Sequence, residues 1–149
     1  MIMCKYIDKV AATEAVLRDY NSMVFIIENT DEFIREKIDR MFSMKSAEID
    51  GMPKVHDPSA FENKMVKCID DVQILKNRYI QAKEYMHWFR PAFEQLDSKE
   101  QHVLDICFMR DDHYNVTETL VDELSMTKSP AYRWKNRAVK HLSVLLYGM

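Results

Sequence analysis

The amino-acid sequence predicts an all-α protein in which two long helices, arranged as a hairpin or bundle, precede a small helix-turn-helix domain. Two observations lead to this prediction: glycine is scarce, and apolar residues recur every seven positions over much of the chain. The 149 residues include 2 glycines and 4 prolines. Because β-hairpin turns commonly use glycine, this composition favours helices. The 11 methionines agree, since methionine is a good helix former and fills irregular helix interfaces.

The first heptad pattern covers residues 3–41 and predicts a long helix with a coiled-coil-like seam. Ten of its twelve positions are apolar. The two columns are Met3, Val10, Leu17, Val24, Asp31 and Ile38, and Tyr6, Thr13, Tyr20, Ile27, Ile34 and Met41. Thr13 and Asp31 are the exceptions. The polar run 28–31 predicts a kink or a break, with Thr30 or Asp31 as the N-cap of a new helix.

The second heptad pattern covers residues 65–96, and all ten of its positions are apolar. Its columns are Met65, Val72, Tyr79, Met86 and Phe93, and Cys68, Leu75, Ala82, Phe89 and Leu96. Asp57 is expected as the N-cap of this helix and Pro58 as its first residue. Pro91 predicts a kink or a boundary near Arg90.

A polar linker, about residues 43–59, separates the two patterns. The flanking helices would each be roughly 55 Å long at 1.5 Å per residue. Matched lengths indicate an antiparallel hairpin, or two hairpins that pair in a homodimer. We therefore expect residues 1–95 to form a helical hairpin or oligomerisation region and residues 96–149 to form a separate domain. A helical scaffold with no further function explains the first region equally well.

Three shorter helices are expected in residues 96–149. Their start signals are, in chain order, Asp97 with Glu100, Asn115 with Glu118, and Thr127. The first helix extends to about Met109, and Ser125–Thr127 forms a three-residue turn before the last helix. The residues expected to be buried on the last helix are Ala131, Trp134, Ala138, Val139, Leu142 and either Leu145 or Leu146.

Charge is distributed unevenly along this second region. Residues 97–123 hold two basic and eight acidic side chains, whereas residues 124–149 hold five basic and no acidic ones. The net charge of −3 for the whole chain hides this difference. If solubility alone determined the surface charges, we would expect acidic and basic residues to be interspersed. A basic helix supported by acidic ones is typical of a helix that lies against a polyanion.

Two stretches resemble a known DNA-binding module. Residues 96–104 are similar to the opening of region 4 of bacterial sigma factors, and residues 124–142 are similar, without gaps, to its recognition-helix half. A Gly51-Met52-Pro53 linker between two long helices, with a module that ends Leu146-Tyr147-Gly148, resembles the phage-encoded ArpU/RinA-type late-gene transcription regulators. The resemblance covers most of the chain and is strongest over residues 96–148.

This resemblance implies a regulator that binds double-stranded DNA with a recognition helix at about residues 127–146 in the major groove. The residues that would contact DNA are Lys128, Ser129, Tyr132, Arg133, Asn136 and Lys140. Lysine and arginine bind phosphates or the edge of guanine, and asparagine pairs with adenine. Ser129 at the helix start would position a phosphate together with free backbone amides.

The sequence departs from the sigma pattern at two positions. Pro130 occupies a position where the family often has a polar side chain that reaches the bases, and Ser125 stands where the turn often has glycine. Two alternatives therefore stay open. One is a minimal sigma-like factor that binds RNA polymerase. The other is a protein-interaction adaptor or inhibitor whose helix-turn-helix does not bind DNA.

Other chemistry has little support in the sequence. The three cysteines and five histidines are widely spaced, without zinc-ligand spacing, and there is no phosphate-binding glycine loop or nucleophile elbow. We expect no enzyme activity, no cofactor and no metal. No apolar run is long enough for a membrane span. The unpaired cysteines fit a cytoplasmic protein of a bacterial host cell.

Overall fold

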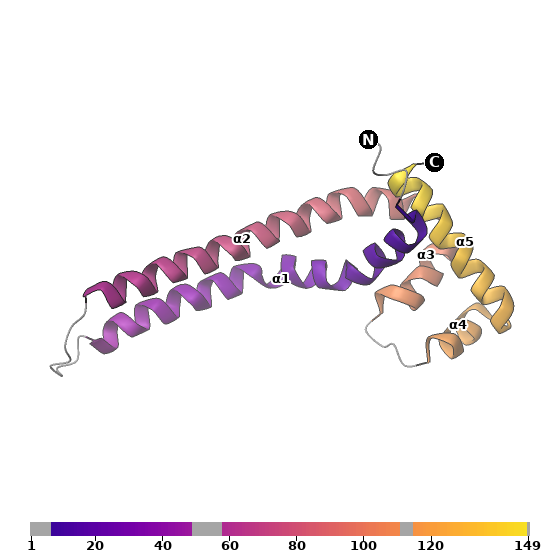
Figure 1. Cartoon of the computed structure of the whole chain (residues 1–149). Helices are drawn as coiled ribbons and strands as arrows, with labels where there is room; N and C mark the ends of the chain where they lie inside the picture. The colour runs from indigo at the N-terminus through magenta and orange to yellow at the C-terminus, as the bar shows by residue number, and fades with distance from the viewer. Residues whose placement is uncertain (1–6, 49–57, 111–114, 149) are drawn as a thin grey trace. The chain divides into compact units, whose positions relative to one another are not determined.

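The computed structural model describes residues 7–48, 58–110 and 115–148, and every element within them is helical. In chain order the elements are α1 (Lys9–Glu48), α2 (Pro58–Glu94), α3 (Ser98–Leu104), a π-helical turn η2 (Asp105–Met109), α4 (Val116–Leu124) and α5 (Lys128–Tyr147). Figure 1 shows the two long helices and the three short ones. The expected all-α class with two long helices is confirmed.

The chain divides into two compact units, which are described separately. Residues 24–83 form the hairpin unit, which contains the second part of α1 and the first part of α2. Residues 1–23 and 84–149 form the terminal unit, in which the beginning of α1 and the end of α2 are grouped with the three short helices. This division is one of packing. A functional boundary between residues 95 and 96 stays a prediction.

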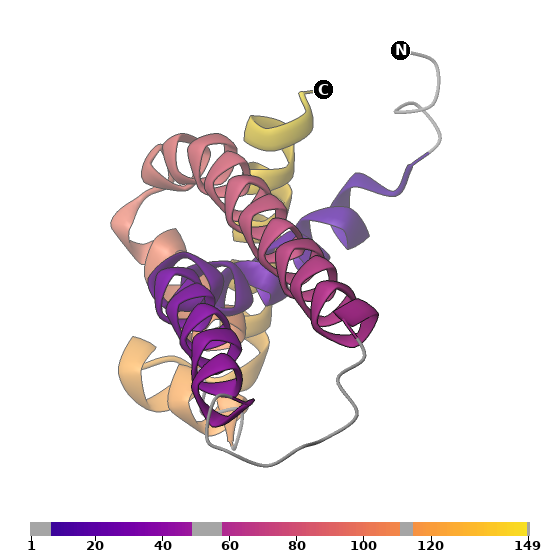
Figure 2. The same ribbon diagram turned by 90° about the vertical axis from the view of Figure 1, so that its left-hand side faces the viewer.

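The hairpin unit consists of two antiparallel helix segments. Lys37 on α1 forms an ion pair of 3.0 Å with Asp71 on α2, and the Cys68 thiol donates a hydrogen bond of 3.8 Å to the Lys37 carbonyl. Figures 1 and 2 show the two segments side by side. Among the residues of this unit whose burial is described, Thr30 and Ala82 are the two that are buried. The unit is a helix pair with little enclosed core.

The terminal unit contains the hydrophobic core. A larger cluster consists of the buried residues Leu17, Phe89, Leu96, Leu104, Phe108, Ala138, Val139 and Leu142. A smaller cluster consists of Val103, Ile106, Leu120 and Ala131. Burying a side chain such as leucine or phenylalanine contributes roughly 1.5–3 kcal/mol. Burial of the apolar side chains in the two clusters therefore contributes substantially to the stability of this unit.

Polar contacts join the ends of the long helices inside the terminal unit. The Tyr85 hydroxyl donates a hydrogen bond of 2.6 Å to the Val16 carbonyl, and burial, followed by the nearby Asp19 carboxylate, raises the pKa of this tyrosine. The Asn21 amide donates a bond of 2.7 Å to the Met109 carbonyl at the end of η2. The first part of α1 is thus held against both α2 and the short helices.

The π-helical turn was not expected, because the sequence predicted a regular helix as far as Met109. The Arg110 amide donates to the Asp105 carbonyl at 3.0 Å, which is the five-residue spacing of a π turn. Within this wider turn Ile106 packs into the smaller cluster and Phe108 into the larger one. The turn therefore supplies apolar side chains to both clusters.

The expected break at residues 28–31, with Thr30 or Asp31 as a new N-cap, was wrong, because α1 is continuous from Lys9 to Glu48. The alternative expectation of a kink there stays a prediction. The Thr30 hydroxyl donates to the Ile26 carbonyl, and the Asn29 amide donates to the Phe25 carbonyl at 2.9 Å. These side chains satisfy carbonyls of the preceding turn instead of capping a new helix. Thr13, the other exception in the heptad columns, is fully buried and bonds to the Lys9 carbonyl in the same way at 2.7 Å.

Two further boundaries differ from the expectations. The helix α2 does not end near Arg90 but passes through Pro91 and ends at Glu94. The linker is shorter than residues 43–59, because α1 extends to Glu48 and α2 begins at Pro58, as expected for that proline. Residues 43–48 include good helix formers, and the Ser43 hydroxyl donates to the Asp39 carbonyl at 2.8 Å. Met3, Tyr6 and Asp57 lie outside the described residues.

Candidate nucleic-acid interface

The candidate interface is formed by α4, the turn after it and α5. The turn consists of the three expected residues, Ser125–Thr127. Ser125 adopts a left-handed conformation with φ of 51°, and its amide bonds to the Val121 carbonyl at the end of α4. Thr127 is extended and occupies the N-cap position of α5, although no hydrogen bond from its side chain caps the helix. A left-handed residue in this position explains why glycine suits such a turn.

One face of α5 is fixed by the core. Ala131 packs in the smaller cluster beside Leu120 of α4, while Ala138, Val139 and Leu142 pack in the larger cluster. These buried positions agree with the sequence prediction. Leu146 packs at the edge of the larger cluster, whereas Leu145 is 38% exposed. Because one face of α5 is held in this way, the opposite face is presented to solvent.

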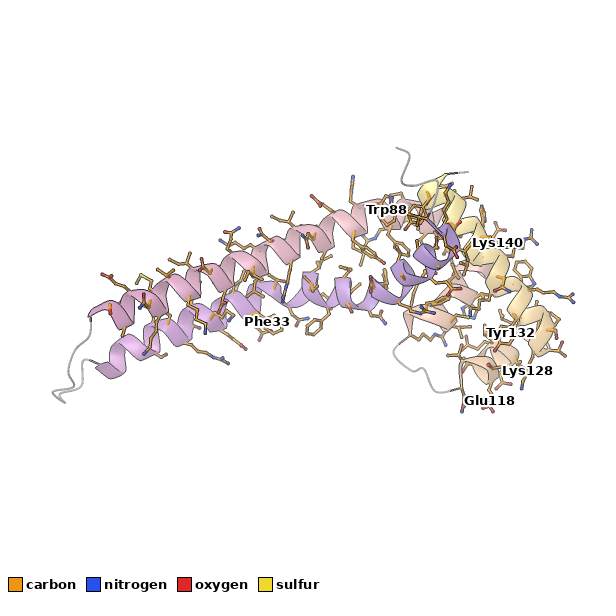
Figure 3. The ribbon with its side chains drawn as sticks, viewed as in Figure 1. Phe33, Trp88, Glu118, Lys128, Tyr132 and Lys140 are labelled. Atoms are coloured by element: carbon orange, nitrogen blue, oxygen red, sulfur yellow. The ribbon has the colours of Figure 1, made fainter. Side chains whose placement is uncertain are left out.

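All six residues predicted to contact DNA are exposed. They are Lys128, Ser129, Tyr132, Arg133, Asn136 and Lys140. Residues 129, 133, 136 and 140 follow spacings of four, three and four, which place them on one side of a helix. In Figure 3 the side chains of Lys128, Tyr132 and Lys140 can be followed along α5. The predicted residues thus form a solvent-exposed surface, which we call the α5 face.

Tyr132 lies at the edge of this face. Its hydroxyl is 3.1 Å from the hydroxyl of Thr117 on α4, and its side chain is 44% exposed. The contact positions the ring where α4 and α5 meet. The ring therefore keeps an accessible surface while its orientation is restricted.

Two of the five basic residues of the last helix contact aromatic rings within the terminal unit. Lys135 is half-buried, and its ammonium group lies 5.2 Å from the centre of the Phe108 ring. Arg137 is exposed and lies 5.3 Å from the centre of the Trp134 ring. Lysine and arginine at such distances from an aromatic face make cation–π contacts. Lys128, Arg133 and Lys140 are the basic residues among the six predicted contacts, and Arg137, which is four residues after Arg133, is exposed next to them.

Trp134 was expected in the core and is half-buried. Its ring packs at the edge of the smaller cluster. The Lys99 ammonium group lies 4.2 Å from the ring centre, with Arg137 also over the ring. Lys99 comes from α3, and no pattern in the sequence predicted this contact, because residues 99 and 134 meet only through packing of α3 against α5.

Several acidic residues that precede α5 have basic partners within the terminal unit. Arg110 donates to Glu123 at 2.7 and 3.1 Å and to Asp105 at 3.0 Å. His102 lies 3.0 Å from Glu123 as well. The hydrogen bonds from Arg110 hold the pKa of Glu123 below its ordinary value, and they raise the pKa of Arg110. Part of the negative charge of residues 97–123 is thus neutralised by basic partners within the terminal unit.

Glu100 is a second acidic residue with a local role. Its carboxylate is 4% exposed, accepts a hydrogen bond of 3.2 Å from the Asp97 amide and lies 2.8 Å from Nδ1 of His141. The capping box expected from Asp97 and Glu100 is therefore present. Since His141 belongs to α5, this carboxylate also joins the start of α3 to the last helix.

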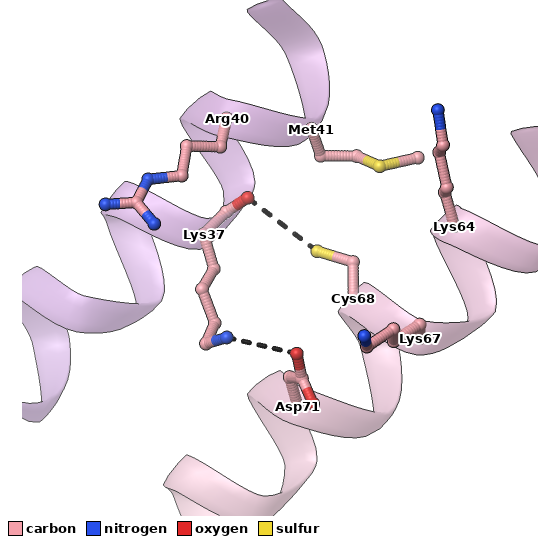
Figure 4. Close-up of a pocket in the computed structure, with 7 residues that line it drawn as sticks. All are labelled: Lys37, Arg40, Met41, Lys64, Lys67, Cys68 and Asp71. Atoms are coloured by element: carbon pink, nitrogen blue, oxygen red, sulfur yellow. Dashed lines mark hydrogen bonds and ion pairs between the residues drawn. The ribbon is translucent and has the colours of Figure 1, made fainter. Parts of the chain in front are cut away.

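The hairpin unit contains a separate charged pocket, shown in Figure 4. Its volume is about 360 Å³, and it is lined by Lys37, Arg40, Met41, Lys64, Lys67, Cys68 and Asp71. Lys37 is engaged by Asp71, while Arg40 and Lys64 point away from that pair in Figure 4. Five of the seven lining residues carry a charge, and four of these five are basic.

Metal and thiol chemistry receive no additional support from the described residues. Among these, no three histidine, cysteine or acidic side chains are grouped as metal ligands. Burial raises the pKa of the Cys107 thiol to about 11, so that it stays protonated at neutral pH. No helix in the described part of the chain has the length and apolarity needed to cross a membrane.

Comparison of the chain with protein-family models, with curated protein sequences and with solved structures gives no match.

Proposed function

We propose that the protein is a sequence-specific transcription regulator that binds double-stranded DNA, with α4 and α5 as its helix-turn-helix and α5 as the recognition helix. The observation that carries the proposal is the α5 face. It presents Lys128, Arg133 and Lys140 together with polar side chains, on a helix that has no acidic residue and whose opposite face is buried. Such a surface matches the phosphates and base edges of a major groove.

The short turn supports the same proposal. Two helices joined by three residues, the second of them basic and exposed, form the arrangement by which helix-turn-helix proteins insert a helix into DNA. The Ser129 hydroxyl and the amides of Lys128 and Ser129 in the first turn of α5 would bind a phosphate. Pro130 lies in that first turn, where the amides lack intrahelical partners, and α5 is continuous through it.

The proposal includes the biological setting implied by the resemblance to ArpU/RinA-type regulators: a phage or prophage regulator in the cytoplasm of a bacterial host. It also includes self-association through the hairpin unit, since a two-fold dimer would present two recognition helices to two half-sites. RNA polymerase is the alternative partner. Val144 and Leu145 near the end of α5, exposed by 46% and 38%, favour a protein contact there.

The proposal is tested by reversing charge on the α5 face. The variant Lys128→Glu with Arg133→Glu is expected to abolish binding to duplex DNA, measured by fluorescence anisotropy with a pool of random duplexes and then with selected sites. For the unmodified protein, a plot of the logarithm of the association constant against the logarithm of the salt concentration should have a slope of about −3 to −5 per subunit.

The matched control is Lys64→Glu with Lys67→Glu, which changes the net charge equally but in the hairpin unit. It should bind DNA as the unmodified protein does. Equal losses in both variants would show that net charge alone drives association. Unchanged binding in the α5 variant, or binding that does not depend on salt, would sink the proposal and favour the adaptor or inhibitor alternative.

A further inference from the structure

Two cations from different helices lie over the ring of Trp134. The Lys99 ammonium group on α3 is 4.2 Å from the ring centre, and the Arg137 guanidinium group on α5 is 5.3 Å from it. Lys99 and the ring are half-buried, whereas Arg137 is exposed. A cation–π contact restricts the position of a cation but, unlike an ion pair, leaves its charge uncompensated. The ring therefore positions the Lys99 charge without neutralising it.

Arg133 extends these two cations into a cluster of three. Residues 133 and 137 are four positions apart on α5 and are therefore neighbours on its surface. We call Lys99, Arg133 and Arg137 the basic flank. Within the part of the chain that the structure describes, none of the three forms an ion pair with an acidic side chain. This distinguishes them from Arg110, which is paired with two carboxylates.

The acidic side chains at the start of α3 have other positions and partners. The Glu100 side chain is 4% exposed, and its carboxylate lies 2.8 Å from Nδ1 of His141. Asp97 is the N-cap of α3, two positions before Lys99, a spacing at which side chains along a helix do not face each other. The cations of the basic flank therefore repel one another in the free protein. Binding of an anionic ligand would relieve this repulsion.

The basic flank lies to one side of the proposed recognition helix. Trp134 follows Arg133 and Tyr132 precedes it, so at about 100° per residue the two rings lie on opposite sides of Arg133. A helix with its side chains is about 10–12 Å across, and the major groove is about 12 Å wide. A helix in the groove fills this width, so that groups beside the helix meet the phosphates at the edges of the groove.

We propose that the DNA-binding surface extends from the helix-turn-helix onto α3, where Lys99 binds a phosphate at the edge of the major groove. Arg137 binds a neighbouring phosphate of the same strand. Trp134 is a positioning residue that acts through Lys99 and does not stack on a base. This inference rests on the proposed function and adds a contact from a helix that contains none of the six predicted contact residues.

The first test removes the Lys99 charge from the full-length protein and measures the salt dependence of binding by fluorescence anisotropy. Lys99→Gln should bind random duplexes roughly 5–10-fold more weakly at 0.1 M salt, and its log–log slope should be less negative by about 0.9, the contribution of one phosphate. Because phosphate contacts carry no sequence information, selected sites should show the same fold-loss. Lys99→Arg, which keeps the charge, should retain the slope of the unmodified protein.

The matched control is Lys83→Gln in the hairpin unit. Lys83 also lies over an aromatic ring, with its ammonium group 5.1 Å from the centre of the Tyr79 ring. This variant removes the same charge and the same kind of contact at a different place, so its affinity and slope should equal those of the unmodified protein.

The second test concerns the ring. Trp134→Leu removes the aromatic face, and its affinity should fall as far as that of Lys99→Gln, with little further loss when the two changes are combined. Trp134→Phe keeps an aromatic face and should retain most of the affinity. Circular dichroism checks that each variant is folded. Losses that simply multiply in the double variant would overturn the positioning role of Trp134.

The outcomes separate this inference from the proposed function. Equal affinity and slope for Lys99→Gln and the unmodified protein would overturn the contact on α3 and leave the α5 face as the DNA-binding surface. An equal loss in Lys83→Gln would also overturn it, because net charge and not position would then determine binding. A loss confined to selected sites would indicate base readout instead of a phosphate contact. An unmodified protein that does not bind duplex DNA would overturn the inference together with the proposed function.

Discussion

The terminal unit and the hairpin unit both contain segments of the long helices, but the apolar residues of these segments are more deeply buried in the terminal unit. Both are crossed by α2, whose Phe89 in the terminal unit is 1% exposed and whose Ile69 in the hairpin unit is 60% exposed. In the terminal unit the long helices meet α3, α5 and the π turn, whose side chains enclose them. In the hairpin unit two helices cover only one stripe of each other.

This difference teaches that a heptad pattern does not by itself specify a core. Two helices in contact bury the residues that face each other and leave the flanking positions in water. A third or fourth helix is needed to enclose them. The terminal unit obtains these helices from its own chain. The proposed dimer would supply them to the hairpin unit from a second copy.

The largest effect is expected for a core truncation in the terminal unit. Phe89→Ala should lower the free energy of unfolding by about 3–5 kcal/mol, because it leaves a cavity among stacked aromatic rings. Denaturant unfolding is followed by tryptophan fluorescence, which reports the terminal unit because Trp88 and Trp134 belong to it, and by circular dichroism, which reports the helices of both units. Ile74→Ala in the hairpin unit is the control and should change the value by less than about 0.5 kcal/mol. Similar losses in the two variants would contradict the contrast between the units.

A smaller, stabilising effect is expected at the turn between α4 and α5. Ser125 has φ of 51°, a conformation that costs residues with a side chain energy and that glycine adopts freely. Ser125→Gly should raise the free energy of unfolding of the terminal unit by roughly 0.5–1 kcal/mol. The measurement is the same fluorescence-detected unfolding, with Ser129→Gly within α5 as the control that should destabilise. A loss of stability in Ser125→Gly would show that the serine is required for another reason.

The smallest effect is expected for the ion pairs around Arg110, which lie at the surface. Because hydrogen bonds from Arg110 lower the pKa of Glu123 in the folded protein, their stabilisation is present above the ordinary value of 4.5 and is lost as the pH falls through the lowered value. Glu123→Gln should therefore lower the free energy of unfolding of the terminal unit near neutral pH. In this variant the free energy of unfolding should also fall less as the pH is lowered. Unfolding curves at a series of pH values measure this. An identical pH dependence in the variant would show that the pair does not stabilise the fold.

Much of the secondary structure could be predicted from the sequence, because its causes are local. Scarce glycine and two heptad patterns predicted the long helices, and Pro58 and the three-residue turn Ser125–Thr127 were placed correctly. The break at Thr30 was wrong because a polar run resembles a cap, whereas these side chains can equally bond to the preceding turn within a helix. The boundary expected near Arg90 was also wrong, since α2 continues through Pro91 to Glu94, and the kink that was the alternative stays a prediction.

For the candidate interface too, some features could be predicted from the sequence and others depend on the tertiary structure. The sequence by itself determined which residues of α5 are polar and at what spacing, and this fixes the exposed positions from 128 to 140 once the core side is known. Only the tertiary structure decided that Lys135 rests on Phe108, that Arg110 engages Asp105 and Glu123, and that Glu100 joins α3 to His141. Such contacts join residues that helical periodicity cannot relate, so they depend on how the helices pack.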